Sequence, residues 1–459
     1  MDSLLSQFGD LTIAGATVAH RNPYLGSNDP APDSVVINMD MTQPNAWEDL
    51  CNARWPYAPE FEKLILETRF AKAVPWDKMP ALLDDYMEKW GKDQYSCYIC
   101  PFGLSRIAHK NKGRERRFDD VAVRSLAISQ YFAAALVAPD PTKLNTGSVW
   151  TFPVIHFENA LKGEWTNSEV KLKNCQVTFI LETSLYAIDD GNLVCIDLTV
   201  NKVLYSININ EKFKITLTDL ETLHVSMTGF ILVVSQKCGF AVFYQNSETL
   251  SIDLVEYKAN PLDPGEDPLY DDLVYTTGAM DLDKLVLGRS DGQVERWTLQ
   301  RGVENDKTKF SLIKRETWDF FVDQASDHNL RPLKMVSKDP VTGIYARGRR
   351  LMVFSKNNRV SLEILEGTPI TMLDENKANP IACVSVFGDF IGVLYVNSTL
   401  EVGRYSGTKP VYTHDSPKTR LPPFNLIPMG EQRVTAFADM VMVLSQDGHM
   451  YNLTLTKIK

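Results

Sequence analysis

The chain has 459 residues, of which 44% are hydrophobic and 23% are charged, and its formal net charge is −10. These proportions are close to the average for soluble globular proteins, and a chain of this length can bury a large core without disulfides. Because an acidic protein gains little from counterion release and is repelled by anionic lipids, general nucleic-acid binding and membrane-surface binding are both disfavoured.

The first 118 residues divide into two regions. Residues 1–43 are rich in glycine, asparagine, aspartate and proline, which predicts an irregular N-terminal arm. Residues 44–118 are predicted to form a helical module, with helices over 46–55, 60–70 and 79–90. In the first of these, apolar side chains recur at i, i+3, i+4 and i+8 along one stripe of a helix: Trp47, Leu50, Cys51 and Trp55.

From Asp119 to the C-terminus the apolar period changes from 3.6 to 2, which predicts short β-strands. One unit recurs along this region: an apolar strand, a tight polar turn and an alternating strand. Seven copies can be aligned on a residue in the turn, and these residues are Gly147, Gly191, Gly239, Gly292, Asn358, Ser398 and Gly448. Their average spacing is about 50 residues, within reach of the roughly 40–50 expected for a four-stranded propeller blade.

The turn residues fit tight hairpins, because primed hairpin turns need positive φ and therefore favour glycine or asparagine. The longest interval, between Gly292 and Asn358, is predicted to contain an inserted loop over 298–324. The acidic stretch 260–272 in the preceding interval is predicted to form a second long loop.

A single unit of this kind cannot bury both faces of its sheet, whereas seven arranged radially can. The repeat therefore predicts a mainly β fold: a seven-bladed β-propeller over residues 119–459 with a small N-terminal α-helical module. Six or eight blades are alternatives, as is a β-sandwich or a pair of separate β domains.

The turns also carry a family resemblance. Their Gly-x-apolar-x-apolar pattern resembles that of a diverged WD-repeat propeller. Three turns contain Asp-Gly: Asp190-Gly191, Asp291-Gly292 and Asp447-Gly448. The Gly-His and Trp-Asp dipeptides of that family are missing from nearly all units, and Trp297 alone stands where the usual tryptophan does. The resemblance implies a scaffold that presents a rim and a face to other proteins.

Residues 40–56, DMTQPNAWEDLCNARWP, resemble the C-terminal half of an F-box, which a helix of the form Trp-x-x-Leu-Cys-x-x-Arg-Trp-Pro closes. The matching positions are Trp47, Leu50, Cys51, Arg54, Trp55 and Pro56. Residues 74–90 resemble the linker helices that join an F-box to its substrate domain. The first half of the family's motif, a Leu-Pro followed by amphipathic helices, has no counterpart in residues 1–43.

This second resemblance implies the substrate adaptor of an SCF-type ubiquitin ligase. Its helices would dock on the adaptor subunit of the ligase, with contacts from Trp47, Leu50, Cys51 and Trp55, and its propeller would bind the substrate protein. The chain would then need no catalytic residue and no cofactor, because the ubiquitin chemistry belongs to its partners. Three alternatives remain: these side chains pack against the propeller, the propeller is a scaffold in another intracellular complex, or it is an enzyme.

Two basic clusters are candidate binding sites for acidic or phosphorylated partners. One covers residues 110–117, and the other consists of Arg347, Arg349 and Arg350. A solvated interdomain linker explains the first cluster better than binding does, and a hairpin on the rim explains the second equally well.

Cys97 and Cys100 have the spacing of a zinc half-site, but no second Cys-x-x-Cys completes four ligands, so packed thiols are predicted and no metal. No hydrolase, metalloprotease or phosphate-loop motif is present, so no catalysis is predicted. The seven cysteines are scattered, the N-terminus lacks a secretory pattern and no run of 18 apolar residues occurs, which predicts the cytosol or the nucleus.

Overall fold

The computed structural model describes part of the chain. The described residues are 16–20, 35–39, 45–54, 63, 67, 72–91, 96–101, 122–129, 131–138, 147–153, 166–260, 273–281, 283–304, 307–318, 340–347, 350–355, 358–363, 372–375, 381–387, 390–395, 400–404, 410–414, 434–437, 440–444 and 449–454. Most of them lie in β-strands, so the chain is mainly β, as the repeat predicts.

Four-stranded antiparallel sheets make up the bulk of the molecule, and the described residues form seven of them. The first three consist of β4 (Ala122–Ile128), β5 (Phe132–Ala138), β6 (Gly147–Pro153) and β7 (Thr166–Leu172); β8 (Cys175–Leu181), β9 (Ser184–Asp189), β10 (Asn192–Asp197) and β11 (Lys202–Asn208); and β12 (Leu220–Val225), β13 (Phe230–Ser235), β14 (Gly239–Gln245) and β15 (Ile252–Ala259).

The next three follow the same order along the chain. They consist of β16 (Tyr275–Asp281), β17 (Lys284–Arg289), β18 (Val294–Glu304) and β19 (Lys307–Trp318); β20 (Val341–Arg347), β21 (Arg350–Ser355), β22 (Asn358–Glu363) and β23 (Met372–Glu375); and β24 (Ile381–Phe387), β25 (Phe390–Tyr395), β26 (Leu400–Arg404) and β27 (Pro410–His414). Three of the seven turn residues of the repeat, Gly147, Gly239 and Asn358, begin the third strand of a sheet, and the other four positions lie in sequence between a second and a third strand.

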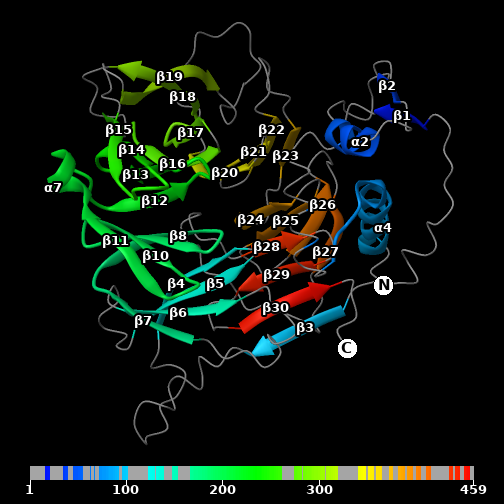
Figure 1. Cartoon of the computed structure of the whole chain (residues 1–459), viewed down its shortest axis with the longest axis horizontal. Coiled ribbons are helices and arrows are strands. Elements are labelled where there is room, and N and C mark those ends of the chain that lie inside the picture. Colours follow the sequence, from blue (N-terminus) through cyan, green and yellow to red (C-terminus); the bar gives the residue numbers. More distant parts are fainter. Residues whose placement is uncertain are drawn as a thin grey trace, which may run out of the picture.

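The sheets contact one another in a closed circuit. First strands of successive sheets touch, from β4 through β8, β12, β16, β20 and β24 to β28, and β29 touches β4. Figure 1 shows these first strands toward the middle of the molecule, with the fourth strands at the periphery. Each sheet is therefore covered on both faces by neighbours, as blades of a propeller are and the layers of a sandwich are not.

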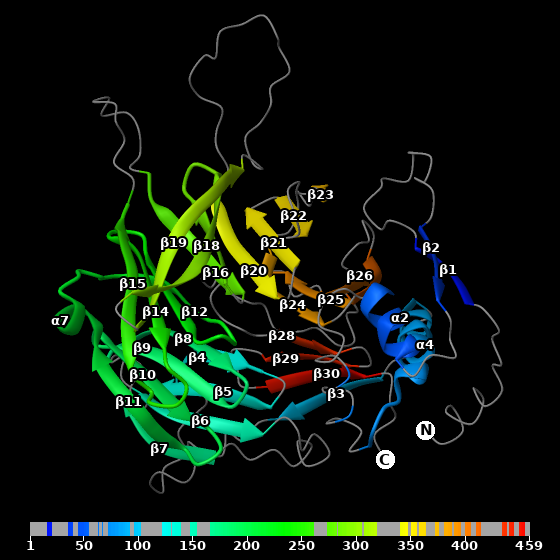
Figure 2. The same cartoon turned by 45° about the horizontal axis from the view of Figure 1, so that its top comes forward.

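The seventh sheet draws strands from both ends of the chain. It contains β28 (Val434–Phe437), β29 (Met440–Leu444), β30 (His449–Thr454) and, at its outer edge, β3 (Ser96–Pro101). The β3 strand lies beside β30 (Figure 2) and pairs antiparallel with it, with Tyr98 opposite Asn452. The boundary at residue 119 stays a prediction, but β3 lies before it and belongs to a sheet of the region after it.

A β-bulge recurs at the same place in six sheets. The register shifts after the second residue of β4 and after the first residue of the inner strand in the other five sheets, and the bulged residues are Arg124, Gln176, Glu221, Thr276, Thr342 and Ala382. A bulge re-aims one side chain out of the sheet. Gln176 Oε1 accepts the backbone amide of Leu220 at 3.4 Å, and Thr276 Oγ1 donates to the carbonyl of Val341 at 2.6 Å. In both pairs the bulge ties one sheet to the next.

Apolar side chains fill the spaces between adjacent sheets. One cluster joins the β8–β11 and β12–β15 sheets, with Ile188, Leu193, Ile231 and Phe243 almost fully buried. The short helix α7 (Ile209–Phe213) closes this space at the periphery, where the ring of Phe213 lies 5.4 Å from that of Phe243.

The interval predicted to hold a loop over 298–324 instead holds much of an extended hairpin. Strands β18 and β19 have 11 and 12 residues, and they pair from Val294↔Trp318 to Glu304↔Lys307. Alternating Trp297, Leu299 and Leu312 are buried, which explains why the insertion continues the sheet.

Before the sheets, the described residues form two strands and three short helical segments. The β1 strand (Ala16–His20) pairs antiparallel with β2 (Val35–Met39), within the region predicted to be an irregular arm. Helices α2 (Ala46–Arg54) and α4 (Met79–Gly91) flank the 3₁₀ turn η1 (Trp76–Lys78). In the second predicted helix, over 60–70, only residues 63 and 67 are described.

Candidate interaction site

The N-terminal helices pack on one another and on one outer strand. Helix α2 contacts η1, η1 contacts α4, and α4 contacts β27 at the edge of the β24–β27 sheet. Figures 1 and 2 both show α2 and α4 side by side against this part of the molecule. Met79, at the start of α4, is fully buried, as is Tyr86 on the same helix apart from a small exposed fraction.

The predicted contact residues of α2 differ in their access to solvent. Cys51 is fully buried, and its thiol donates to the carbonyl of Trp76 at 3.7 Å, so this side chain serves packing within the chain. Trp47 is half-buried on the same helix. Leu50 belongs to α2, whereas Trp55 lies outside the described residues. Of the two stripe side chains whose burial is described, Trp47 is the one that keeps a partly open surface.

The predicted arginine cluster lies at a tight turn. Arg347 ends β20, Arg350 begins β21, and the two residues are register partners across the turn. Arg349 and residues 110–117 lie outside the described residues, so the binding role of both basic clusters stays a prediction.

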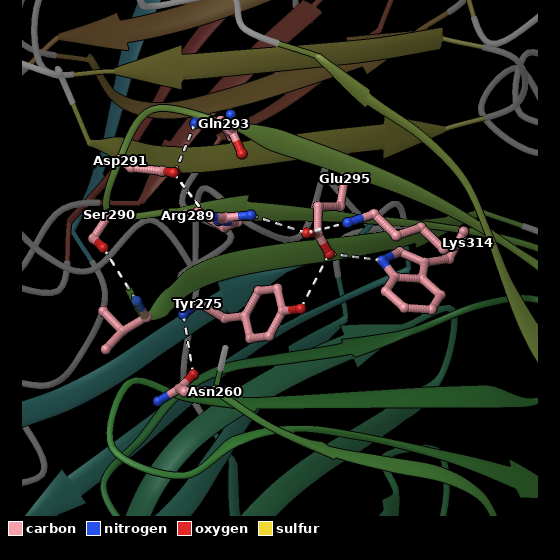
Figure 3. Close-up of polar contacts among 10 residues, drawn as sticks. Asn260, Tyr275, Arg289, Ser290, Asp291, Gln293, Glu295 and Lys314 are labelled. Carbon is pink, nitrogen blue, oxygen red and sulfur yellow. Dashed lines mark hydrogen bonds and ion pairs between the residues drawn. The ribbon is translucent and has the colours of Figure 1, made fainter. Parts of the chain in front are cut away.

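A buried carboxylate forms the densest polar cluster of the described residues (Figure 3). Glu295 Oε1 accepts hydrogen bonds from Arg289 Nη1 at 3.1 Å and Lys314 Nζ at 2.6 Å. Its Oε2 accepts from Tyr275 Oη at 3.0 Å and Trp297 Nε1 at 3.2 Å. These donors come from β16, β17, β18 and β19, so one side chain connects all four strands of the sheet.

The same cluster fixes a turn at the rim. Arg289 Nη2 donates to Asp291 Oδ2 at 2.7 Å, while Asp291 Oδ1 accepts the amide of Gln293 at 3.1 Å. Gly292 follows with a φ of +80°, a conformation that glycine adopts without strain. The Asp-Gly turn singled out in the sequence is thus held by an arginine that the sequence did not single out.

Electrostatics keeps Glu295 ionised. Burial acts to raise the pKa of this carboxyl, but Lys314, Tyr275 and Arg289 outweigh burial and hold the pKa below its usual range. Burial raises the pKa of Tyr275, and the adjacent Glu295 adds to this effect. The cluster is internally satisfied at Glu295, which suits a structural support better than a catalytic acid.

Two other titratable groups in the sheets, Cys195 and His224, have pKa values that burial shifts away from the ordinary values. Burial raises the pKa of the Cys195 thiol to about 11, which opposes a nucleophilic role. His224 stacks on Phe179 with ring centroids 4.5 Å apart, and its Nδ1 accepts the amide of Met280 at 3.3 Å. Burial lowers the pKa of His224 to about 4.

Metal ligands do not gather in the part of the chain that the structure describes, where no group of three or more histidine, cysteine or acidic side chains could hold an ion. Cys97 and Cys100 both belong to β3, opposite Leu453 and Met450 of β30. Within the same described ranges, no helix is long and apolar enough to span a bilayer.

Comparison with known proteins does not assign the chain to a family. No protein-family model and no curated protein matches it. Among solved structures, it is similar to the β-propeller domain of Cps50 (Swd1) from Myceliophteria thermophila, with 11% identity, a TM-score of 0.46 and coverage of 73% of this chain and 96% of that one.

Two further structures are similar at the same level. The computationally designed Ika8 protein has 9% identity, a TM-score of 0.42 and coverage of 73% of this chain and 96% of its own. KlHsv2 with loop 6CD replaced by a Gly-Ser linker has 10% identity, a TM-score of 0.43 and coverage of 71% and 90%. Identities and TM-scores this low carry no argument about the fold. The description of the fold therefore rests on the chain's own sheets and on the contacts between them.

Proposed function

We propose that this chain is a seven-bladed β-propeller that acts without catalysis as a binding scaffold for other proteins, in the cytosol or the nucleus. The observation that carries the proposal is the closed circuit of four-stranded sheets, with a helical segment seated on one outer strand. A ring of this kind offers a rigid perimeter, and its outer strands can present side chains to partners. Both carboxylate oxygens of the buried Glu295 accept hydrogen bonds from within its own sheet, which fits a support role.

A sharper form of the proposal assigns the chain to an SCF-type ubiquitin ligase as substrate adaptor. Trp47, Leu50 and Trp55 would contact the adaptor subunit of the ligase, and the propeller would hold the substrate. The motif in α2 supports this form, together with the half-buried state of Trp47. The strands β1 and β2, which precede α2 where an F-box has helices, are a departure from the family pattern.

Co-precipitation of the full-length protein with the ligase adaptor subunit tests this assignment. Trp47→Ala combined with Leu50→Ala is expected to abolish association if the helices dock there. Glu48→Ala combined with Asp49→Ala is the matched control, because both residues lie on α2 and neither is buried. Association that survives the first pair, or no association of the unaltered protein, removes the ligase assignment and leaves the scaffold.

The arginine cluster is proposed to hold an acidic or phosphorylated segment of the substrate. Reversing Arg349 and Arg350 to glutamate is expected to reduce substrate binding, whereas Arg315→Glu on the exposed edge of β19 is expected to leave it unchanged. Equal losses in both variants would mean that general charge, and not this cluster, drives binding.

A further inference from the structure

The outer strand β11 carries an unusual surface for a sheet edge. Exposed large apolar side chains are few among the described residues: Val200 (65%), Val203 (38%), Leu204 (39%) and Met227 (58%). Three of these four lie within five residues, in the turn before β11 and on its first half. Clustered exposed apolar residues mark interaction sites, whereas single ones are ordinary.

The other outer strands with described side chains lack this feature. Exposed residues on β7 are threonine, asparagine, glutamate and lysine, and those on β19 are mostly lysine, arginine, serine and threonine. Charged residues at a sheet edge prevent it from pairing with other chains. The β11 strand has only one such residue, Lys202, beside its aliphatic pair.

The hydrogen-bonding edge of β11 is open. It is the last strand of its sheet, paired with β10 on one side. Within the described ranges, no backbone hydrogen bond joins residues 202–207 to a strand other than β10. Figures 1 and 2 show β11 at the periphery, with α7 beyond its end. An open edge is complementary to an extended backbone, which can add as a further strand.

The positive charge of Lys202 indicates which kind of partner segment fits the β11 edge. Lys202 is exposed and forms no ion pair with any described residue, although several lysines elsewhere on the molecule do. An added strand that places a carboxylate near Lys202 and aliphatic side chains near Val203 and Leu204 would match every exposed group on this half of the edge.

We propose that the β11 edge binds an extended segment of a partner protein by strand addition, and that this segment alternates aliphatic residues with at least one acidic residue. The proposal deepens the scaffold function and rests on it, because it assigns one surface and one class of ligand to the perimeter of the ring. The segment's backbone pairs with residues 202–207, and its side chains lie beside Val203 and Leu204 on the two faces of the sheet.

A displayed library of random peptides of about 12 residues, selected on the immobilised full-length protein, provides the probe. Enriched peptides are expected to alternate aliphatic and polar residues with an acidic position. Leu204→Lys is expected to lower the affinity of the protein for these peptides about tenfold or more. Lys202→Glu is expected to lower the affinity for the acidic peptides selectively. Hydrogen exchange of the amides of residues 202–207 is expected to slow when a selected peptide is bound.

Met227→Lys is the matched control, because it places the same charge at an exposed apolar site that is not on a sheet edge. Peptides that bind Leu204→Lys as well as the unaltered protein, or that slow exchange elsewhere, would overturn the proposal. Sedimentation analysis decides whether a second copy is the occupant: self-association abolished by Leu204→Lys would also overturn it.

The outcome separates this surface from the scaffold function. If cellular partners bind Leu204→Lys undiminished, the scaffold stands and the β11 assignment is wrong. If the unaltered protein binds no cellular partner at all, the scaffold function itself fails.

Discussion

Thr276 donates its hydroxyl hydrogen bond to the carbonyl of Val341, at 2.6 Å and between two different sheets. Thr276 is the bulged residue of β16, and Val341 begins β20 in the next sheet. Because Val341 is buried, its carbonyl has little access to water as a replacement partner. The bulge thus places the Thr276 hydroxyl where it forms a hydrogen bond between two neighbouring sheets.

Thr276→Val is expected to lower the free energy of unfolding by about 1–2 kcal/mol, because it removes the hydroxyl and leaves a buried carbonyl without this donor. Urea unfolding measures the change. Thr276→Ser keeps the hydroxyl and should recover most of the loss. If Thr276→Ser is as unstable as Thr276→Val, packing of the methyl group is responsible instead.

Glu295→Ala is expected to lower the free energy of unfolding by about 3–5 kcal/mol, because it removes one of the two anions paired with the buried Arg289 and leaves Tyr275 and Trp297 without their acceptor. Glu316→Ala removes the more exposed partner of Arg296 in the same sheet and should cost about 1 kcal/mol or less. Since the folded-state pKa of Glu295 lies below the ordinary value, its contribution is full above pH 4.5 and is lost as pH falls through the folded pKa. Similar losses in both variants would mean that Glu295 is not the organising group.

His224 should make stability depend on pH in mildly acidic solution. Its folded-state pKa of about 4 lies below the ordinary value of 6.5, so the unfolded chain binds the extra proton first. The stability that the neutral form of His224 contributes is therefore fully present above about pH 6.5. As the pH drops toward 4, the free energy of unfolding falls by about 1–3 kcal/mol. Chemical unfolding from pH 7 to 4, compared with His224→Gln, measures this slope. An identical slope in the variant would contradict the assignment.

Two glycines with positive φ should respond differently to alanine. At Gly239, with φ +113°, an added Cβ would lie 2.1 Å from the carbonyl oxygen of Lys258. At Gly191, with φ +76°, the nearest atom would be Asn210 Nδ2 at 4.0 Å. Gly191→Ala is expected to cost about 1 kcal/mol from backbone strain, and Gly239→Ala clearly more, because the backbone must also move. Equal unfolding midpoints in urea would show that β15 moves away from the added Cβ at Gly239 without a cost in stability.

Removal of β3 should open the ring. A protein that begins at residue 92 keeps β3, whereas one that begins at residue 102 leaves the edge of β30 unpaired. The longer protein is expected to unfold cooperatively, and the shorter one to melt at lower temperature and to self-associate through the exposed edge. Calorimetry and size-exclusion chromatography measure both effects. Comparing the longer protein with the full chain isolates the contribution of the helices.

Local signals carried most of the fold prediction. Alternation along strands such as β13 and positive-φ residues such as Gly191 and Gly239 are properties of neighbouring residues, so they are readable without a partner. The hairpin of β18 and β19 was mistaken for a loop because charged residues interrupt its alternation, although Phe310 and Leu312 keep it.

Long-range pairing left no such signal. The fourth strand of the last sheet is β3, far from β30 in sequence, and its alternation is no stronger than that of many short segments. Burial of Cys51 was equally hidden, because its cover comes from Trp76 on another element.

The pairing of β3 with β30 also constrains how the molecule is made. A ribosome synthesises the chain from its amino terminus, so β3 emerges early, but its partner β30 follows only after the strands of the six other sheets. Throughout that time its backbone groups have no strand to pair with in the finished register, and they are open to chaperones or to wrong partners. A nascent chain interrupted before His449 therefore cannot complete the ring.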